Sequence, residues 1–301
     1  MRVPERARVA LSSAGLNRSM LVRRLIRYGH PHLREVRERA MTRNDPASLA
    51  MRGGIRWLEA GLIRVPQGYG GGLTFDMRYL PISHAHIGSI AFGNLESAVQ
   101  EAMVRHLGRG GVFYDIGANL GFFSLLGGHL AGLHEGHVYA FEAAPENAEA
   151  IRHHAELNGV PNISVLQVAV SDHAGVGRLQ IVDDQSWSKL EDYGEHPGTQ
   201  EVIEVQLVAI DDLVANGSVK PPTVVKIDVE GAELAVLQGM RRTLAEHRPA
   251  VICELHGTHD EFVAFMDEQN YRLINLEGTI PVREEGASAH ALGLPPGDLG
   301  D

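Results

Sequence analysis

The chain has 301 residues, of which 44% are hydrophobic and 22% charged, a composition typical of a soluble globular protein with one large domain and a smaller appendage. Its single cysteine, Cys253, excludes an internal disulfide framework and favours a reducing compartment. No apolar stretch reaches the roughly 18 residues of a transmembrane helix, and the N-terminus lacks the apolar core of a secretory signal. We therefore expect a cytoplasmic protein without stable membrane insertion.

Charge is distributed unevenly along the sequence. Residues 1–45 hold 11 arginines and 4 acidic residues, whereas the remaining chain holds 16 basic and 34 acidic residues, which gives a net charge of −11. An acidic body argues against a broad nucleic-acid-binding surface, so we expect no nucleic-acid partner. A basic arm can bind anionic lipid, but packing on the acidic body or on a second copy is favoured, and a homodimer through this arm is one expectation.

Residues 1–91 are predicted to form an N-terminal extension with a helical basic arm and an irregular cap. The apolar residues of the arm recur at helical spacing. A strand is expected over residues 73–80. His84 and His86 have a spacing that can suit a metal, but no nearby Cys or His completes a ligand set, so a loop is favoured. A helix over residues 95–107 ends at glycines.

From Val112 the pattern alternates strands with helices, which is typical of a mostly parallel sheet. Core strands are expected at residues 112–116, 137–142, 163–170, 223–228, 250–254 and 271–276. Helices are expected at residues 145–158, 232–247 and 259–269. Two further strands, 178–182 and 202–208, flank a polar insert at 183–200. The tail, residues 284–301, has little to bury and is predicted to be mobile.

The stretch GVFYDIGANLGFFSLL, residues 111–126, contains a strand, a glycine turn and the start of a helix. This arrangement opens a ligand-binding crevice at the carboxyl edge of an α/β sheet. Asp115 precedes the turn, and Glu142 ends the second strand, where an acid can accept hydrogen bonds from a ribose diol. A dinucleotide fingerprint needs glycine where this chain has Asn119, and Asp115 would repel phosphates. A cationic, adenosine-bearing ligand such as S-adenosylmethionine therefore fits better than a dinucleotide.

The fourth core strand carries candidates for the acceptor side of a site. Lys226, Asp228 and Glu230 alternate, so in an extended strand their side chains point the same way. Lys226 can pair structurally with Asp228 or Glu254, and Glu230 can favour the dipole of the next helix. We expect a general base among Asp228, Glu230 and His256. The favoured interpretation assigns no metal, but Asp228, Glu254 and His256 would suit a divalent ion if they converge.

Four stretches stand out in order along the chain. They are DIGANLGFFS at residues 115–124, VYAFE at 138–142 followed by PEN at 145–147, AVSD at 169–172, and KIDVEGAE at 226–233. Together they resemble the motifs of FkbM-type S-adenosylmethionine-dependent methyltransferases. There are two departures: Ala143 follows Glu142 where the family commonly has proline, and Leu95 precedes Glu96 where an aromatic residue is frequent.

The resemblance implies a class I methyltransferase domain over residues 92–283. Its fold would be α/β and Rossmann-like, with a mostly parallel seven-stranded sheet, helices on both faces and a terminal antiparallel strand. The implied cofactor is S-adenosyl-L-methionine, with its methionine moiety on Asp115 and the turn 117–121, its ribose on Glu142 and its adenine near Ser171 or Asp172. The cofactor-binding residues implied by position are Asp115, Gly117, Asn119, Gly121, Glu142, Ser171 and Asp172.

The expected activity is O-methylation of a small-molecule hydroxyl acceptor, such as a sugar, a polyketide or another natural product. An NAD-dependent oxidoreductase is the alternative enzyme class, and a non-catalytic binding protein with a cofactor fold is a third hypothesis. RNA methylation is disfavoured because the body lacks a basic face. The acceptor pocket would draw on the arm, the 66–95 loops and the 183–200 insert, where Trp187, Tyr193 and His196 can contact a sugar or a ring.

Overall fold

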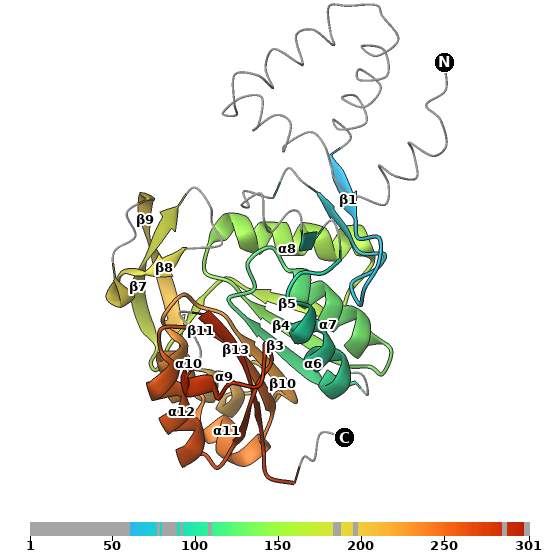
Figure 1. The fold of residues 1–301 in the computed structure, drawn as a ribbon. Helices are drawn as coiled ribbons and strands as arrows, with labels where there is room; N and C mark the ends of the chain where they lie inside the picture. Colours follow the sequence, from blue (N-terminus) through green and yellow to red (C-terminus); the bar gives the residue numbers. More distant parts are fainter. Residues whose placement is uncertain are drawn as a thin grey trace, which may run out of the picture. The chain divides into compact units, whose positions relative to one another are not determined.

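The computed structural model describes residues 61–76, 79, 89–90, 93–107, 110–182, 188–194, 198–284 and 288–297 (Figure 1). The chain divides into two compact units, Met1–Leu95 and Glu96–Asp301. In the first unit, β1 (Leu62–Arg64) pairs antiparallel with β2 (Thr74–Asp76), inside the strand predicted at 73–80. The predicted helical arm, with the homodimer expected through it, and the His84–His86 pair lie outside the described residues.

The second unit is built on a seven-stranded sheet with the order β12-β13-β11-β10-β3-β4-β5. Its strands are β3 (Val112–Ile116), β4 (His137–Phe141), β5 (Ile163–Leu166), β10 (Val224–Ile227), β11 (Ala250–His256), β12 (Arg272–Asn275) and β13 (Ser288–Leu294). The five strands from β5 to β11 run parallel, and β13 is antiparallel to both of its neighbours. This arrangement confirms the predicted mostly parallel sheet with one antiparallel strand.

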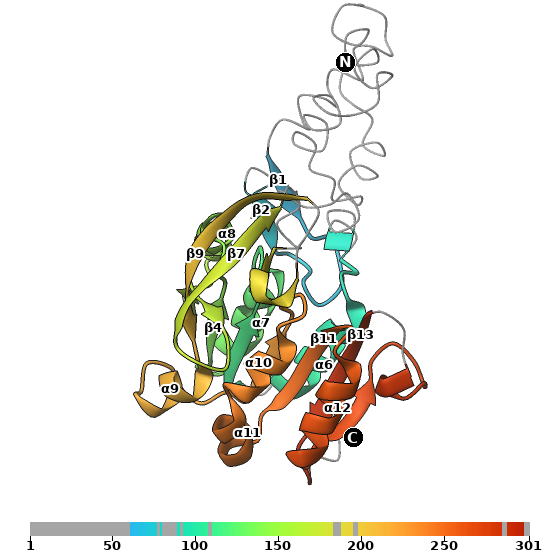
Figure 2. The same ribbon diagram turned by 90° about the vertical axis from the view of Figure 1, so that its left-hand side faces the viewer.

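Helices pack in two groups around this sheet (Figures 1 and 2). The first group comprises α6 (Ser97–Leu107), α7 (Phe122–Gly132) and α8 (Pro145–Asn158), and the second comprises α9 (Ile210–Ala215), α10 (Glu233–Gln238), α11 (Arg241–His247) and α12 (His259–Glu268). Every residue of the central strand β10 is buried, as expected for a strand with both faces covered. Within the described residues, no helix combines the length and the apolarity that crossing a bilayer requires.

A second, four-stranded sheet lies beside the carboxyl end of β4. Its order is β6-β9-β7-β8, from β6 (Ala169–Val170), β7 (Gly175–Val182), β8 (Lys189–Leu190) and β9 (Thr199–Val208). The strand predicted at 163–170 is thus divided between two sheets. The division occurs because the N–H of Val168 turns back to the carbonyl oxygen of Leu166 at 3.0 Å. A small apolar cluster joins this sheet to Ala144, just after β4.

The prediction of a mobile tail over residues 284–301 is wrong for Ser288–Leu294. This segment forms β13, between β11 and β12, and supplies the seventh strand of the sheet. Ala289 and Ala291 are fully buried, and a Cβ placed on Gly293 would come within 2.4 Å of Met266 in α12. A larger side chain at Gly293 would therefore displace the end of Met266. Alanine and glycine are weak strand formers, and this segment is rich in both. Its amino-acid composition therefore predicted a loop where the structure has a buried strand.

The helix predicted over residues 232–247 is broken into α10 and α11. At the break, Gly239 lies against the backbone after β6, because a Cβ at this position would be 2.0 Å from the carbonyl oxygen of Ser171. The carbonyl oxygen of Gly239 accepts a hydrogen bond from the N–H of Asp211 at 2.8 Å. This oxygen is therefore used outside the helix rather than in a helical hydrogen bond. The break brings the segment that carries Ser171 close to the segment that follows β10.

Candidate active site

The carboxyl end of β3 leads into a tight turn. Gly117 has φ 79° and Gly121 has φ 82°, both in the left-handed region that glycine adopts without strain. A Cβ at Gly117 would lie 1.8 Å from the carbonyl oxygen of Asp228, the residue after β10. The turn therefore presses directly against the end of the neighbouring strand, at the edge where an α/β sheet binds ligands.

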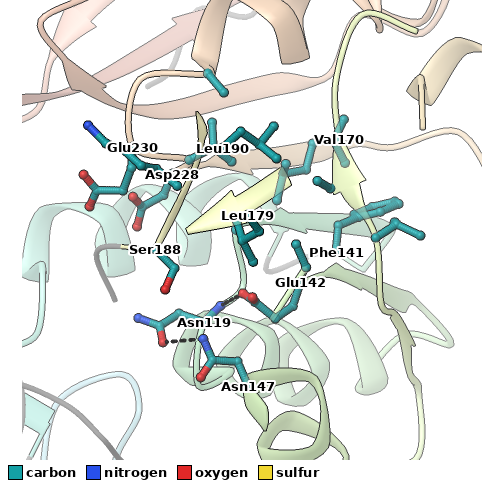
Figure 3. A pocket seen from close by; sticks show the side chains of 18 residues that line it. Asn119, Phe141, Glu142, Asn147, Val170, Leu179, Ser188, Leu190, Asp228 and Glu230 are labelled. Atoms are coloured by element: carbon teal, nitrogen blue, oxygen red, sulfur yellow. Dashed lines mark hydrogen bonds between the residues drawn. The ribbon is translucent and has the colours of Figure 1, made fainter. Parts of the chain in front are cut away.

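Glu142, just after β4, accepts one backbone hydrogen bond from this turn and another from its own segment. Its Oε2 accepts the N–H of Asn119 at 2.7 Å (Figure 3), and its Oε1 accepts the N–H of Ala144 at 2.8 Å. Burial raises the pKa of Glu142 to about 7, although these hydrogen bonds act in the opposite direction. A carboxylate offers about four acceptor positions, so positions remain for hydroxyl groups of a ligand.

Asp115 on β3 is 1% exposed and carries an acceptor atom without a hydrogen bond. Its Oδ2 accepts the hydroxyl of Ser124 in α7, whereas its Oδ1 is buried with no hydrogen-bond partner among the described residues. Burial raises the pKa of Asp115 to about 6, against the lowering effect of Lys226, its neighbour in strand register. A buried acceptor beside the glycine turn fits a ligand ammonium, such as that of S-adenosylmethionine.

A pocket with about 660 Å³ of empty volume, including its open mouth, lies beside the turn. Figure 3 shows Asn119 and Glu142 in one part of the pocket and Asp228 and Glu230 in another. Apolar lining side chains between them come from β4, β6, β7 and β8: Phe141, Val170, Leu179 and Leu190. The pocket thus offers carboxylates in two places and an apolar wall.

The residues expected near the adenine lie just beyond the pocket. Ser171 and Asp172 follow β6, and the pocket is instead lined by residues 168–170. The hydroxyl of Ser171 donates to Oδ1 of Asp172 at 3.2 Å, and His173 contacts the same oxygen. The described structure therefore turns the side chains of Ser171 and Asp172 toward each other.

Asp228 forms an ion pair with Lys226, one of the two pairings predicted for this lysine. Lys226 is 2% exposed, and its Nζ lies 2.8 Å from Oδ2 of Asp228 and 4.7 Å from the ring centre of Phe123. Burial lowers the pKa of Lys226, but the carboxylates of Asp228, Glu96 and Asp115 outweigh burial and hold this pKa above its ordinary value. Lys226 is therefore a cation that fixes one oxygen of Asp228 at the pocket.

Glu230 lines the pocket in a conformation uncommon for its residue type. Its φ of 51° lies in the left-handed region, where residues other than glycine are rare and often functional. Burial raises the pKa of Glu230 to about 7, and His256 opposes this rise. A carboxylate with a pKa near neutrality can accept a proton efficiently at physiological pH.

His256 does not line the pocket, and carboxylates surround its ring. Its Nδ1 lies 2.8 Å from Oε1 of Glu233, and its Nε2 lies 3.6 Å from Glu254 and 3.7 Å from Glu230. Burial lowers the pKa of His256, but these carboxylates outweigh burial and raise it to about 11. An imidazolium has no lone pair to accept a proton, so the geometry favours Asp228 or Glu230 over His256 as the base.

The structure brings together the three residues of the predicted metal variant. One ligand atom each of Asp228, Glu254 and His256 lies within 4.8 Å of the others. The convergence that this variant required is therefore present. Tyr193 of the insert is also near this end, because a Cβ on Gly231 would lie 3.7 Å from the Cβ of Tyr193. Trp187 and His196 lie outside the described residues.

A family comparison matches residues 115–273, more than half of the chain, to the methyltransferase FkbM domain. The chain belongs to the FkbM methyltransferase family. The match includes the glycine turn, Glu142 and the block 226–233, and it ends before β13. The sequence resemblance to this family is thereby confirmed.

The chain is similar to two curated proteins whose names state an activity. The 31-O-demethyl-FK506 methyltransferase FkbM of Streptomyces tacrolimicus is 30% identical over 227 residues, which cover 64% of this chain and 86% of the relative. The hexuronic acid methyltransferase AglP of Haloferax volcanii is 30% identical over 152 residues, which cover 50% of this chain and 57% of the relative. Among solved structures, the methyltransferase FkbM of Methylobacillus flagellatus KT matches with 17% identity and a TM-score of 0.41, covering 72% of this chain and 56% of that chain.

Several pocket residues of this FkbM-family chain were not expected from its sequence. Leu179 and Leu190 form part of the apolar wall, and Ser188 and Asn147 add polar atoms (Figure 3). The sequence predicted a strand over residues 178–182 but not its position beside the pocket. Asn147 was quoted in a motif, yet its link to the turn, a hydrogen bond from its Nδ2 to Asn119 Oδ1 at 3.4 Å, depends on tertiary structure.

Proposed function

We propose that this protein transfers a methyl group from S-adenosyl-L-methionine to a hydroxyl oxygen of a small-molecule acceptor. The observation that carries the proposal is the pocket that joins the glycine turn and Glu142 to the carboxylates Asp228 and Glu230. The names of the two curated relatives support this class of acceptor, since one acts on an O-demethylated FK506 and the other on a hexuronic acid. A sugar or polyketide hydroxyl is therefore the acceptor we infer.

The cofactor would lie along the first part of the pocket. Asp115 is not among the residues that line the pocket, so its buried Oδ1 would meet the methionine ammonium beside the glycine turn, and the free acceptor positions of Glu142 would receive the ribose hydroxyls. Asn119 stands where a dinucleotide fingerprint has the glycine that lets the backbone approach a pyrophosphate. When bound, the cofactor supplies a methyl group on a positively charged sulfur.

The acceptor would enter at the end of the pocket that Asp228 and Glu230 line. The pocket orients the acceptor oxygen toward the methyl carbon and excludes water from the reacting pair. As the acceptor oxygen takes the methyl group, a carboxylate at this end would accept the hydroxyl proton. Glu230 suits this step because it lines the pocket and faces its cationic neighbour, Nε2 of His256, at 3.7 Å, whereas Asp228 is held by Lys226 at 2.8 Å.

Calorimetric titration with S-adenosylmethionine and with NAD tests the donor. We expect S-adenosylmethionine to bind and NAD to show no measurable heat. Asp115→Asn should weaken S-adenosylmethionine binding by about 100-fold, because it removes the charge that faces the ammonium, a loss of roughly 2–3 kcal/mol for a buried charged hydrogen bond. A methyl-transfer screen with labelled cofactor and cell extract then identifies acceptors.

The matched control is Asp212→Asn, since Asp212 is 64% exposed on its side chain and pairs only loosely, at 3.8 Å, with Arg242. Its affinity for S-adenosylmethionine should equal that of the unchanged protein. Binding of NAD but not of S-adenosylmethionine would refute the proposed function, and unchanged affinity in Asp115→Asn would refute the role of Asp115.

Cofactor affinity should also rise with pH through neutrality. The ribose hydroxyls donate to the ionised form of Glu142, whose pKa in the free protein is about 7. Binding then favours deprotonation, so affinity should be about tenfold lower at pH 6 than at pH 8. Titration calorimetry across this range measures the effect. Glu142→Gln should bind more weakly and show a flatter pH profile; an equally steep profile in this variant would assign the pH dependence to another group.

A further inference from the structure

A second cluster of ligating side chains lies where α6, β11 and β13 meet. Glu96 immediately precedes α6, Glu254 lies on β11, and His290 lies on β13 directly opposite Glu254 in the strand register. One ligand atom from each lies within 4.8 Å of the other two. None of the three residues lines the pocket, so the methyl-transfer mechanism does not use them.

Two atoms of this cluster are buried without hydrogen bonds. His290 is 8% exposed, and in the described part of the chain neither its Nε2 nor Oε2 of Glu96 has a hydrogen-bond partner. The Nε2 atom nevertheless faces Oε2 of Glu96 at 3.3 Å and Oε2 of Glu254 at 3.4 Å. Two carboxylate oxygens at these distances can hold a proton on Nε2, and the same three atoms become a ligand set when a metal ion replaces that proton.

The other nitrogen of His290 sets the direction of its lone pair. Its Nδ1 lies 2.6 Å from Oε1 of Glu277, which follows β12. A carboxylate accepts the hydrogen bond, so Nδ1 donates and the lone pair of a neutral imidazole is on Nε2, toward Glu96 and Glu254. Metal-binding histidines are commonly oriented in this way by a carboxylate behind the ring.

We propose that Glu96, Glu254 and His290 bind a divalent first-row transition-metal ion, such as Zn²⁺ or Mn²⁺. Bonds of about 2.1 Å at tetrahedral angles place ligand atoms about 3.4 Å apart. The separations of 3.3 Å and 3.4 Å around Nε2 match this spacing. Two carboxylates and one imidazole suit these ions, whereas Mg²⁺ and Ca²⁺ favour oxygen ligands alone.

The ion would join elements that are distant in sequence and act beside the acceptor end of the pocket. Glu254 is the link, because its Oε1 lies 3.6 Å from Nε2 of His256, which in turn lies 3.7 Å from Glu230. A cation on Oε2 of Glu254 fixes this carboxylate and offsets its charge. The proposal rests on neither the identity of the cofactor nor that of the acceptor.

Metal titration of the 301-residue chain, first dialysed against a chelator, tests the proposal. Calorimetry with ZnCl₂ and electron paramagnetic resonance with MnCl₂ should each show one ion bound to Glu96, Glu254 and His290. Glu96→Gln and His290→Gln should each weaken binding by at least about 100-fold, and Glu277→Gln, which only positions His290, by about 10–100-fold. MgCl₂ should not compete at equal concentration.

The control is Glu101→Gln, an exposed position on the same helix, which should leave metal affinity unchanged. Thermal unfolding in metal-free buffer establishes that each variant is folded. If His290→Gln does not fold, the isosteric Glu96→Gln variant tests the metal site in its place. Absence of binding to the unchanged chain overturns the proposal. Binding that survives Glu96→Gln but is lost in Asp228→Asn also overturns it, because the ion would then occupy Asp228, Glu254 and His256.

Discussion

Gly117→Ala should abolish measurable binding of S-adenosylmethionine. The added Cβ would be 1.8 Å from the carbonyl oxygen of Asp228, so the turn and the end of β10 must separate. This separation moves the turn away from Glu142 and moves Asp228 at the acceptor end. A displacement of about 1 Å in a binding site can cost roughly 100-fold, and the left-handed φ of 79° adds backbone strain. Titration calorimetry and thermal unfolding measure the two effects.

Gly159→Ala provides the matched control. Gly159 ends α8 with φ 63°, but a Cβ there meets nothing within 4 Å. This variant carries the backbone strain alone, about 1–2 kcal/mol of stability, and should bind the cofactor normally. If both variants lost affinity equally, strain rather than the contact with Asp228 would explain the result, and the pocket edge assigned to Gly117 would be wrong.

Glu230→Gln should lower kcat by roughly 10²–10⁴ while leaving cofactor affinity nearly unchanged. The substitution keeps the size of the side chain and its place at the pocket, but an amide cannot accept the acceptor proton. Initial rates with an acceptor identified by the labelled-methyl screen give kcat, and calorimetry gives the Kd for S-adenosylmethionine. The split between the two quantities identifies a group that acts in the chemical step.

Glu201→Gln, at an exposed position of β9, is the control and should retain full kcat. Asp228→Asn separates the two candidate bases. A full loss of kcat in Asp228→Asn together with normal kcat in Glu230→Gln would move the base to Asp228 and contradict the assignment. Loss of cofactor binding in Glu230→Gln would instead make Glu230 a binding residue.

The boundaries of the central strands and helices were predicted closely from the sequence. Residues next to each element determine where it begins and ends. Glycines bound β3, and its apolar residues are buried, so the predicted and observed ranges, 112–116, coincide. Proline at the first turn and Gly159 at the end likewise define α8. The break at Gly239 and the separation of β5 from β6 depend on contacts with distant segments, which leave no periodic signal in the local sequence.

In the candidate site, too, the features determined by local sequence were predicted and those determined by distant contacts were not. Asp115, Gly117 and Glu142 were predicted because each occupies a fixed place at the end of a parallel strand. The state of His256 was not predictable, since its three neighbouring carboxylates come from β11 and from the segment after β10. The partners of Glu96 were hidden for a further reason: His290 belongs to the segment that composition assigned to a mobile tail.

The position of β13 in the sheet constrains the order in which the chain can fold during synthesis. Because β13 is the strand that pairs with β12 among the described residues, and β13 lies between β12 and β11, the side of the sheet beyond β11 cannot assemble until β13 has emerged. Until then the nascent chain exposes an unpaired edge of β11, a surface prone to pairing with other chains. Chaperone dependence or co-translational aggregation of this protein should therefore be governed by the segment that forms β12 and β13 rather than by the parallel strands.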